Sequence, residues 1–414
     1  MTGSVTDIVE IEGHLIDTLM LGRLLDVISS HDAEYQILEF DVGATSPDLS
    51  RARVQVTTGA SDAMEALIAE LQVCGANRVE LGTAETVACS QDGVLPAGFY
   101  STTNLPTSVW IEERRLEVEN PEMDCAIVIL PGSRARTVPM HRVRLGDQIV
   151  VGHHGVRVDL PNKNEALGAF EFMNSEVSPE KPKRLLVSQV AQRIRMIKRG
   201  EHPSGAQKVL AVCGPAVVHT GAASALGRLI REGWIDLLFA GNGFATHDIE
   251  SNVMGTSLGI SVREGIGTEG GHSNHLRVIN EVRRYGSIAA AVDAGYIEAG
   301  VMYECVKNQI PFVLGGSVRD DGPLPDVTCN VVDAADAMRY FVPEIACALM
   351  LSTTLHAIAT GNLLPAAVDT YCVDINQSVV TKLGDRGSHQ AVGIVTDVGL
   401  FVHALANELV GGDG

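Results

Sequence analysis

The stretch IPFVLGGSVRDDGPLPD, residues 310–326, carries the signals on which the fold prediction rests. Residues 310–314 predict a buried strand, which stops at Gly315 and Gly316. A turn with clustered charges follows: Arg319, Asp320 and Asp321. A strand followed by glycines and charge is how an open parallel sheet presents a ligand site at its carboxyl edge. The alternative is a surface turn with solvated charges, because glycine, aspartate and proline are ordinary turn residues.

Strands and helices are predicted to alternate on both sides of this stretch. Strands are expected at 208–213, 235–240, 310–314 and 367–374, and helices at 188–200, 222–232, 245–254 and 276–285. The alanine- and leucine-rich run 344–361 is expected to be a further, partly buried helix. This alternation predicts a Rossmann-like, doubly wound parallel sheet over residues 181–414, so the fold class is α/β.

Two smaller parts are predicted before residue 181. Residues 1–92 predict strand, helix, two strands, helix and strand, which is the ferredoxin-like α+β order, with the last strand over 78–87. Residues 93–180 are rich in proline, glycine and short apolar segments. They predict a small β-rich module that ends in a polar linker.

The composition excludes several classes of protein. The 414 residues carry 31 basic and 51 acidic side chains, a net charge of −20, which repels nucleic acid and anionic membranes. None of the eight cysteines belongs to a C-x-x-C pair, so buried thiols in a reducing cytosol are expected. No signal segment and no apolar run of about 18 residues is found, and a cytoplasmic protein is therefore expected.

Glycines recur at predicted strand ends, at Gly214, Gly241 and Gly315. Each allows a backbone to approach a ligand closely, and together they favour a nucleotide or dinucleotide site. The alternative is that they are ordinary loop glycines. The formal G-x-G-x-x-G at 265–270 follows a weak strand candidate and is interpreted as a glycine-rich surface loop.

Histidine, acidic and thiol side chains between residues 247 and 305 are considered for metal and nucleophile chemistry. His272 and His275 are three residues apart, whereas the zinc-protease helix needs histidines four apart around a glutamate, so no metal is expected. Asp248 and Asn274 are instead predicted to cap helices. Cys305 is either a nucleophile or a buried structural thiol, and no base beside it in the sequence favours the first.

Several polar residues of the last third of the chain stand in apolar surroundings or in loops after strands: Thr354, His356, Asp374, Asp397, Lys382 and Arg386. An acid at a strand end can bind ribose hydroxyls, and a basic side chain in a nearby loop can clamp a carboxylate. The alternative is a structural network in which these groups pair with one another.

Five segments together carry a family resemblance: GHLID at 13–17, GFYSTTN at 98–104, THDIE at 246–250, RDDGPLPD at 319–326 and VDIN at 373–376. Through them the chain resembles the archaeal-type ornithine cyclodeaminase family, long described as LOR/SDH-like, over nearly its whole length. It is also similar to the C-terminal part of the cyanobacterial bifunctional arginine dihydrolase/ornithine cyclodeaminase. The dihydrolase domain of that fusion has no counterpart in the sequence, so dihydrolase activity is not expected.

The resemblance implies NAD as the cofactor, bound in the C-terminal region. The implied cofactor-binding positions are Asn242, Gly243, Asp321, Thr354, Leu355, His356, Asp374, Asp397 and Val398. The implied reaction converts L-ornithine to L-proline and ammonia, with NAD reduced and reoxidised within the cycle. Such a site needs a proton shuttle and a carboxylate clamp. The candidates for the shuttle are Asp320 and Asp321. The candidates for the clamp are Arg319, Lys382 and Arg386.

Two other functions are compatible with the sequence. One is an NAD(P)-dependent amino-acid dehydrogenase of the lysine/saccharopine type, which would release reduced cofactor. The other is a non-catalytic amino-acid sensor that uses the ferredoxin-like part. In each case the partner is a small molecule, and a homo-oligomer is expected.

Overall fold

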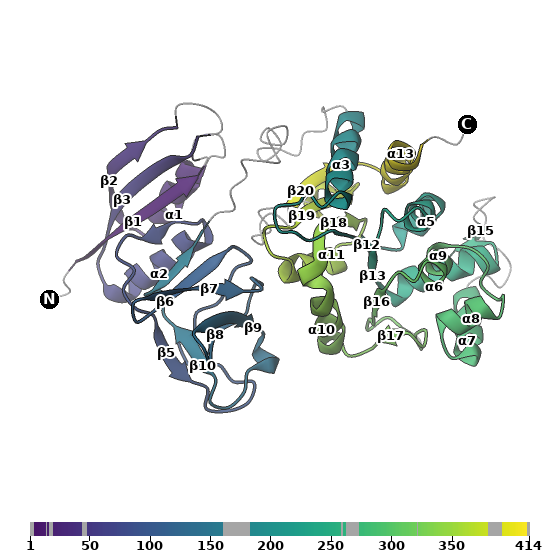
Figure 1. Ribbon diagram of the computed structural model, residues 1–414, viewed down its shortest axis with the longest axis horizontal. Helices are drawn as coiled ribbons and strands as arrows, with labels where there is room; N and C mark the ends of the chain where they lie inside the picture. Colours follow the sequence, from purple (N-terminus) through teal and green to yellow (C-terminus); the bar gives the residue numbers. More distant parts are fainter. Residues whose placement is uncertain are drawn as a thin grey trace. The chain divides into compact units, whose positions relative to one another are not determined.

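The chain folds into two compact units, each described here by itself (Figure 1). The computed structural model describes residues 4–13, 15, 20–43, 48–159, 183–257, 260–261, 273–320, 322–379 and 391–411. The first unit is Met1–Glu176 with Leu364–Ala367, and the second is Val177–Leu363 with Val368–Gly414. Within the described residues, no helix has both the length and the apolar character needed to cross a bilayer. The boundaries at residues 92 and 180 stay predictions.

The first unit begins with a four-stranded antiparallel sheet, in the order β2-β3-β1-β4. Its elements are β1 (Val5–Gly13), α1 (Met20–Ser30), β2 (Glu34–Asp41), β3 (Ser50–Thr58), α2 (Ser61–Val73) and β4 (Asn77–Arg78). Alternate residues of β3, such as Val54 and Val56, are buried against Leu24 of α1 and Leu67 of α2. This order and packing confirm the ferredoxin-like prediction.

The predicted strand over 78–87 is wrong. Strand β4 ends at Arg78, and the next strand, β5 (Glu85–Ala88), pairs with β10 of a different sheet. Gly82 lies between them with a φ of 63°, a left-handed conformation that turns the chain. The apolar pattern therefore spans two short strands that belong to two sheets.

The second sheet of the first unit has seven strands, in the order β11-β6-β7-β9-β8-β10-β5. Its remaining strands are β6 (Thr107–Ile111), β7 (Arg114–Glu119), β8 (Ala126–Leu130), β9 (Arg134–Val138), β10 (Gln148–Val151) and β11 (Val156–Val158). Buried aliphatic side chains such as Val109, Ile127 and Val150 fill its interior. The β-rich prediction is confirmed.

A segment from far along the chain completes the core of this sheet. Ala366 is buried with the strands, and its backbone amide donates to the carbonyl of Asn104 at 2.8 Å. The Asn104 side chain in turn donates to the carbonyl of Leu364 at 3.2 Å. Leu364–Ala367 is therefore a structural part of the first unit.

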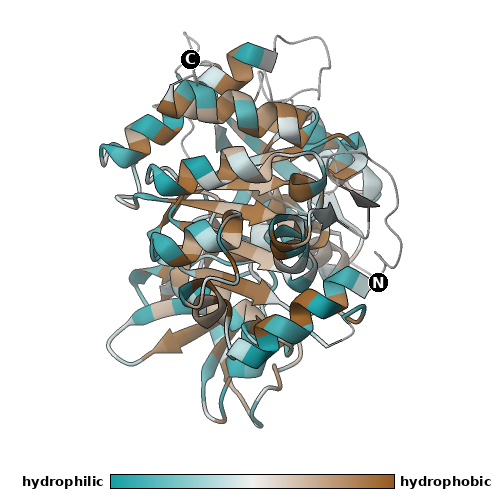
Figure 2. Ribbon diagram, turned by 90° about the vertical axis from the view of Figure 1, so that its right-hand side faces the viewer, coloured by the Kyte–Doolittle hydropathy of each residue, from teal (hydrophilic) through white to brown (hydrophobic). Residues whose placement is uncertain are grey.

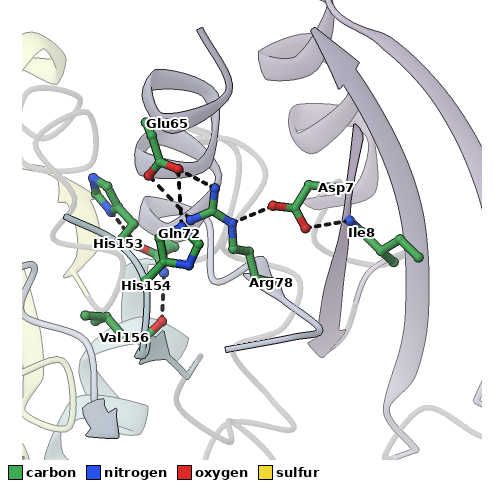
Figure 3. A network of polar contacts seen from close by, with 8 residues as sticks. All are labelled: Asp7, Ile8, Glu65, Gln72, Arg78, His153, His154 and Val156. Carbon is green, nitrogen blue, oxygen red and sulfur yellow. Dashed lines mark hydrogen bonds and ion pairs between the residues drawn. The ribbon is translucent and has the colours of Figure 1, made fainter. Parts of the chain in front are cut away.

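A buried ion-pair network joins the elements of the first unit (Figure 3). Arg78 donates to Asp7 at 2.6 Å and to Glu65 at 2.6 Å, with only 4% of its side chain exposed. Burial alone would raise the pKa of Glu65, but the hydrogen bond and charge of Arg78 hold it below its usual value. Gln72 of α2 donates to the carbonyl of Val156 in β11, so α2 is fastened to both sheets.

The second unit contains a seven-stranded sheet, in the order β17-β16-β13-β12-β18-β19-β20, with every pair parallel. Its strands are β12 (Lys208–Cys213), β13 (Leu237–Gly241), β16 (Phe312–Gly315), β17 (Val327–Thr328), β18 (Ile345–Leu351), β19 (Asp369–Asp374) and β20 (Ala391–Val395). A small hairpin stands apart: β14 (Thr256–Ser257) and β15 (Ile260–Ser261).

Helices cover both faces of the parallel sheet (Figure 1). They are α3 (Lys183–Lys198), α4 (Ala216–His219), α5 (Ala223–Arg231), α6 (Asn242–Val253), α7 (Asn274–Tyr285), α8 (Ile288–Asp293), α9 (Val301–Lys307), α10 (Val331–Phe341), α11 (Leu355–Leu363) and α13 (Val398–Val410). Helix α13 packs on α3 and α5, whereas α10 packs on α11. Their ribbons alternate between hydrophobic and hydrophilic residues, as expected for helices with one buried side (Figure 2). The Rossmann-like, doubly wound prediction is confirmed.

The helix predicted over 344–361 is wrong in its first half. Residues Ile345–Leu351 form the central strand β18, and the helix α11 begins at Leu355. All seven residues of β18 are buried, so the run is apolar on both faces and shows no period that separates strand from helix. Thr354 and His356 therefore lie at a strand-to-helix junction, where a ligand can reach them.

Candidate functional site

The strand order changes direction between β12 and β18. The chain builds β12, β13, β16 and β17 outward on one side, and then returns to add β18 on the other side of β12. Open α/β sheets bind their ligands in the crevice at the carboxyl ends of the strands at such a point. Gly214 and Ser352 follow those two strand ends.

The two backbones approach closely at this point. A Cβ atom on Gly214 would lie 2.0 Å from the carbonyl oxygen of Ser352. Ser352 itself has a φ of 46°, a left-handed conformation that is costly for a residue with a side chain. Strained backbone of this kind clusters at ligand sites, where the surrounding structure holds it in place.

His356 of α11 lies over two of the glycines predicted to admit a ligand. A Cβ on Gly241 would come 2.8 Å from its Nε2, and a Cβ on Gly315 would come 3.3 Å from its Cε1. Burial lowers the pKa of His356, so the ring is neutral at physiological pH. Because Gly241 and Gly315 have no side chains, the neutral imidazole of His356 can lie against them at the carboxyl edge of the sheet.

Asn242 and Asp320, both predicted site residues, contact each other. Asn242 is the first residue of α6, and its Nδ2 donates to Oδ1 of Asp320 at 3.1 Å. Its Oδ1 accepts from the amide of Leu324 at 3.0 Å, and Oδ2 of Asp320 accepts from the amide of Ser317 at 2.7 Å. These bonds hold the loop after β16 against the start of α6. Arg319 in that loop is exposed.

Asp374 and Asp397 follow the neighbouring strands β19 and β20. Oδ1 of Asp374 accepts from the amide of Asn376 at 2.8 Å. Oδ1 of Asp397 accepts from the amide of Leu400 at 2.9 Å and caps α13, whose first residue, Val398, is buried. Each of these bonds uses one carboxylate oxygen for local structure.

Exposed aliphatic side chains follow four strand ends at this edge, after β16, β18, β19 and β20: Val318, Leu355, Ile375 and Leu400. The exposed fractions of Leu355, Ile375 and Leu400 are 80%, 73% and 68%. The sequence-based predictions named Leu355 as a site residue but not Val318, Ile375 or Leu400. An apolar residue directly after a strand-end acid, as Ile375 is, could have indicated this part of the site. Apolar groups exposed at the ligand edge of such a sheet suit a flat ring.

This edge fits a dinucleotide. It combines strand-end acids, the amino ends of α6 and α13, backbone held in close approach, and exposed apolar side chains. Position 243 adds room, because among the described residues outside the backbone of α6 a Cβ there would meet only Pro215 Cγ within 4 Å, at 3.7 Å. The structure therefore brings together the described candidates that follow β13, β16, β18, β19 and β20.

Several candidates lie outside the described residues. They are Asp321, Lys382, Arg386, His272 and the G-x-G-x-x-G at 265–270. Among the residues that are described, no three histidine, cysteine or acidic side chains are grouped so as to hold a metal ion. The roles of shuttle and clamp stay predictions for Asp320 and Arg319 as well.

Asp248 is a cap, but for a helix other than its own. It lies in the middle of α6, fully buried, and accepts from the amides of Val301 at 3.0 Å and Met302 at 2.8 Å, which begin α9. Burial raises its pKa to about 6, although the bonds from Met302 and Val301 act in the opposite direction. Asn274 was also predicted to be a cap. It is instead the first residue of α7, after Ser273.

Cys305 is buried in α9, and burial raises the pKa of its thiol. A thiol with a raised pKa is a poor nucleophile, because the thiolate is the reactive form. Of the two interpretations of this residue, the buried structural thiol is favoured.

Family models match almost the whole chain. Residues 188–405 match the model described as arginine dihydrolase ArgZ-like, C-terminal, Rossmann fold, and residues 106–187 match the first region of the same C-terminal part. Residues 6–105 match the LOR/SDH bifunctional enzyme conserved region.

Individual relatives match over the same span. The ornithine cyclodeaminase of Methanocaldococcus jannaschii is 48% identical over 403 residues, which are 97% of this chain and 95% of the relative. The crystal structure of apo ArgZ, a cyanobacterial arginine dihydrolase, is 38% identical with a TM-score of 0.85, over 99% of this chain and 59% of that one. The ternary complex of AgrE with ornithine and NAD+ is 42% identical with a TM-score of 0.53, over 98% of this chain and 58% of that one.

Proposed function

Because the chain belongs to the family of archaeal ornithine cyclodeaminases and ArgZ-like C-terminal regions, we propose that it converts L-ornithine to L-proline and ammonia. The observation that carries the proposal is the 48% identity over 97% of the chain to a relative of that activity. The carboxyl edge of the parallel sheet supports it, because its residues suit the cofactor that such a reaction needs. The protein is then a lyase of ornithine metabolism that makes proline.

The cofactor proposed for this edge is NAD, which accepts a hydride from the substrate and returns it within one cycle. The residues proposed to hold it are Asn242, Gly243, Asp321, Thr354, Leu355, His356, Asp374, Asp397 and Val398. A carboxylate at a strand end accepts hydrogen bonds from ribose hydroxyls, which is the role proposed for Asp374. The exposed side chains of Ile375 and Leu400 would pack on an apolar ring, and the first amides of α11 would donate to a phosphate.

The test of this proposal is one incubation. With ornithine in excess over NAD, we expect proline and ammonia to form in equal amounts and over many turnovers of the cofactor, with no accumulation of NADH. The physical reason is that the hydride taken from the substrate is returned to it. Proline is measured by chromatography, and NADH by its near-ultraviolet absorbance.

Other outcomes separate the alternatives. NADH that accumulates in proportion to the ornithine or lysine consumed would identify an amino-acid dehydrogenase instead. Absence of turnover, together with a melting temperature that rises with an added amino acid, would favour a sensor.

We also propose that the protein is a homo-oligomer in which a second copy pairs with strand β2. All eight residues of β2 are exposed, and in the sheet order it is an edge strand. Tyr35, Ile37 and Phe40 pair with Val56, Val54 and Ala52, so they share the helix-covered face of the sheet, yet they are 45%, 42% and 37% exposed. An exposed apolar edge strand is a template for another strand.

Antiparallel pairing of two copies is self-complementary along this edge. In the register that places Ile37 opposite Phe40 of the second copy, apolar side chains would meet on the same face. We expect Ile37→Lys to halve the mass seen by light scattering, because a buried unpaired charge opposes the pairing. Leu145→Lys, at a residue 69% exposed in the β-rich part, is the matched control. A wild-type monomer, or an unchanged mass for Ile37→Lys, would contradict the proposal.

A cytoplasmic location is proposed as well. All eight cysteines are free thiols, and six of them are buried. Unpaired buried thiols are characteristic of proteins kept in a reducing compartment.

A further inference from the structure

Helix α6 carries a histidine–glutamate pair that the proposed site has so far left without a role. His247 is 9% exposed, and Glu250, one turn further along the helix, is fully buried. Nδ1 of His247 lies 3.3 Å from Oε2 of Glu250. Burying an acid costs free energy unless the acid is hydrogen-bonded. The structure of the second unit must therefore hold Glu250 in this position.

The Glu250 carboxylate is held in place from its other oxygen. Oε1 accepts from the hydroxyl of Thr256 at 2.8 Å, and that hydroxyl accepts from Nδ2 of Asn274 at 2.9 Å. A fixed carboxylate beside Nδ1 selects the tautomer with its proton on Nδ1. Nε2 is then the atom of His247 that exchanges protons.

Position 243, which lies along α6 between His247 and the carboxyl edge of the sheet, is a glycine and therefore has no side chain. Gly243 precedes His247 by four residues, and helical side chains lean toward the amino end over the residue four before. A Cβ on Gly243 would lie 3.7 Å from Pro215 Cγ, an ordinary van der Waals distance. His247 therefore stands one turn below the proposed cofactor position, with glycine between them.

Within the described part of the chain, His219 of α4 also faces this ring. The two ring centroids are 5.2 Å apart. Burial lowers the pKa of His219, and the charge of His247 lowers it further, whereas Glu250 raises it. His219 is therefore held toward its neutral form beside the ring of His247.

We propose that His247 is the catalytic base that carries protons between the two nitrogens of the substrate, with Glu250 as its positioning residue. This inference rests on the proposed ornithine cyclodeaminase activity. It assigns proton transfer to a pair on α6 and leaves Asp320, whose carboxylate is bonded to Asn242 and Ser317, to hold the loop after β16.

The reaction defines what the base must do. The Cα–N bond of ornithine breaks, a bond from the δ-nitrogen to Cα forms, and the α-nitrogen leaves as ammonia. Both nitrogens of free ornithine are ammonium groups, so each must lose a proton before it can take part. Nε2 of His247 takes a proton from the attacking δ-nitrogen and delivers it to the departing nitrogen. Ornithine carrying one net positive charge thus becomes zwitterionic proline and an ammonium ion, with no net proton exchanged.

The experiment compares His247→Ala with a matched buried histidine. His202 is 5% exposed, and its Nε2 lies 3.6 Å from Asp369, the first residue of β19, at the opposite edge of the sheet. We expect His247→Ala to lower kcat by about 10²- to 10⁴-fold while NAD affinity stays near the wild-type value. His202→Ala is expected to keep kcat. NAD affinity is measured by calorimetry.

Two further measurements report on chemistry that a structural role would not change. Added imidazole is expected to restore turnover to His247→Ala, because it can occupy the space of the lost ring. Glu250→Gln is expected to shift the kcat–pH profile, because an amide replaces the carboxylate that holds the proton on Nδ1 of His247.

The outcomes distinguish the failure of each proposal. A wild-type protein without proline formation would reject the proposed function itself. If the wild type is active, two results would reject His247 as the base. One is a kcat of His247→Ala within about threefold of the wild type. The other is a loss of kcat in His202→Ala as large as that in His247→Ala. A failure of both His247→Ala and the isosteric His247→Asn to fold, combined with an unmoved pH profile for Glu250→Gln, would assign the pair a structural role.

Discussion

Gly214→Ala is expected to abolish NAD binding and to destabilise the second unit by about 1–3 kcal/mol. The new Cβ would lie 2.0 Å from the carbonyl oxygen of Ser352, a backbone atom that cannot rotate away. Strands β12 and β18 would have to separate at their carboxyl ends, where the strand order changes direction. Both the hydrogen bond from Gly214 to Leu351 and the proposed ligand crevice depend on that spacing.

The measurement is thermal unfolding together with calorimetric titration of NAD. A domain of this size loses about 2–4 °C of melting temperature for each kcal/mol of destabilisation. The control is Gly22→Ala in α1, where a Cβ would meet none of the described atoms outside the helix backbone within 4 Å. Alanine stabilises a helix interior relative to glycine by about 0.5–1 kcal/mol, so the control should be at least as stable as the wild type. Wild-type NAD affinity in Gly214→Ala would show that the close approach has no part in binding.

Asp248→Ala is expected to cost about 2–5 kcal/mol, because it leaves two buried amides of α9 without an acceptor. Asp248→Asn keeps one acceptor oxygen and should cost less. Urea unfolding followed by the fluorescence of Trp234, in a Trp110→Phe background, reports on the second unit alone, since the chain has two tryptophans. An unfolding free energy unchanged in Asp248→Ala would show that α9 needs no cap.

The cost of Asp248→Ala should also depend on pH in a definite direction. The folded pKa of about 6 lies above the usual 3.8, so folding favours the protonated carboxyl. Its contribution is complete below pH 3.8 and is lost as the pH rises through 6, a change of about 3 kcal/mol. The difference between wild type and Asp248→Ala is therefore largest near pH 4 and smaller at pH 7. A difference that grew with pH would mean that the buried carboxylate is stabilised in its ionised form.

The sequence predicted the fold best where a single local feature, such as a glycine or an alternating pattern, is enough to identify a strand or its end. Gly241 and Gly315 are the last residues of β13 and β16, as their sequence positions predicted, and the alternation in β3 matches its burial. The run Ile345–Leu351 was misassigned because a strand buried on both faces has no polar period to identify it.

The site was harder to predict than the fold because its contacts join distant residues. Asn242 bonds to Asp320, 78 positions later, and no local pattern indicates that pairing. The ring of His356 lies on Gly241 and Gly315 because β13, β16 and β18 end at the same edge of one parallel sheet. In the same way, Asp248 was identified as a cap, but the helix it caps became evident only from the packing of α6 on α9.

The return of Leu364–Ala367 to the first unit bears on how the protein is made. A ribosome releases the first unit's own strands early, yet Ala366, which is buried among them, emerges after most of the second unit. Until then the backbone groups of Asn104 and the apolar side chains around Ala366 lack their native partner. The first unit therefore reaches its final packing only when the chain has been synthesised past residue 367, after most of the second unit has been made.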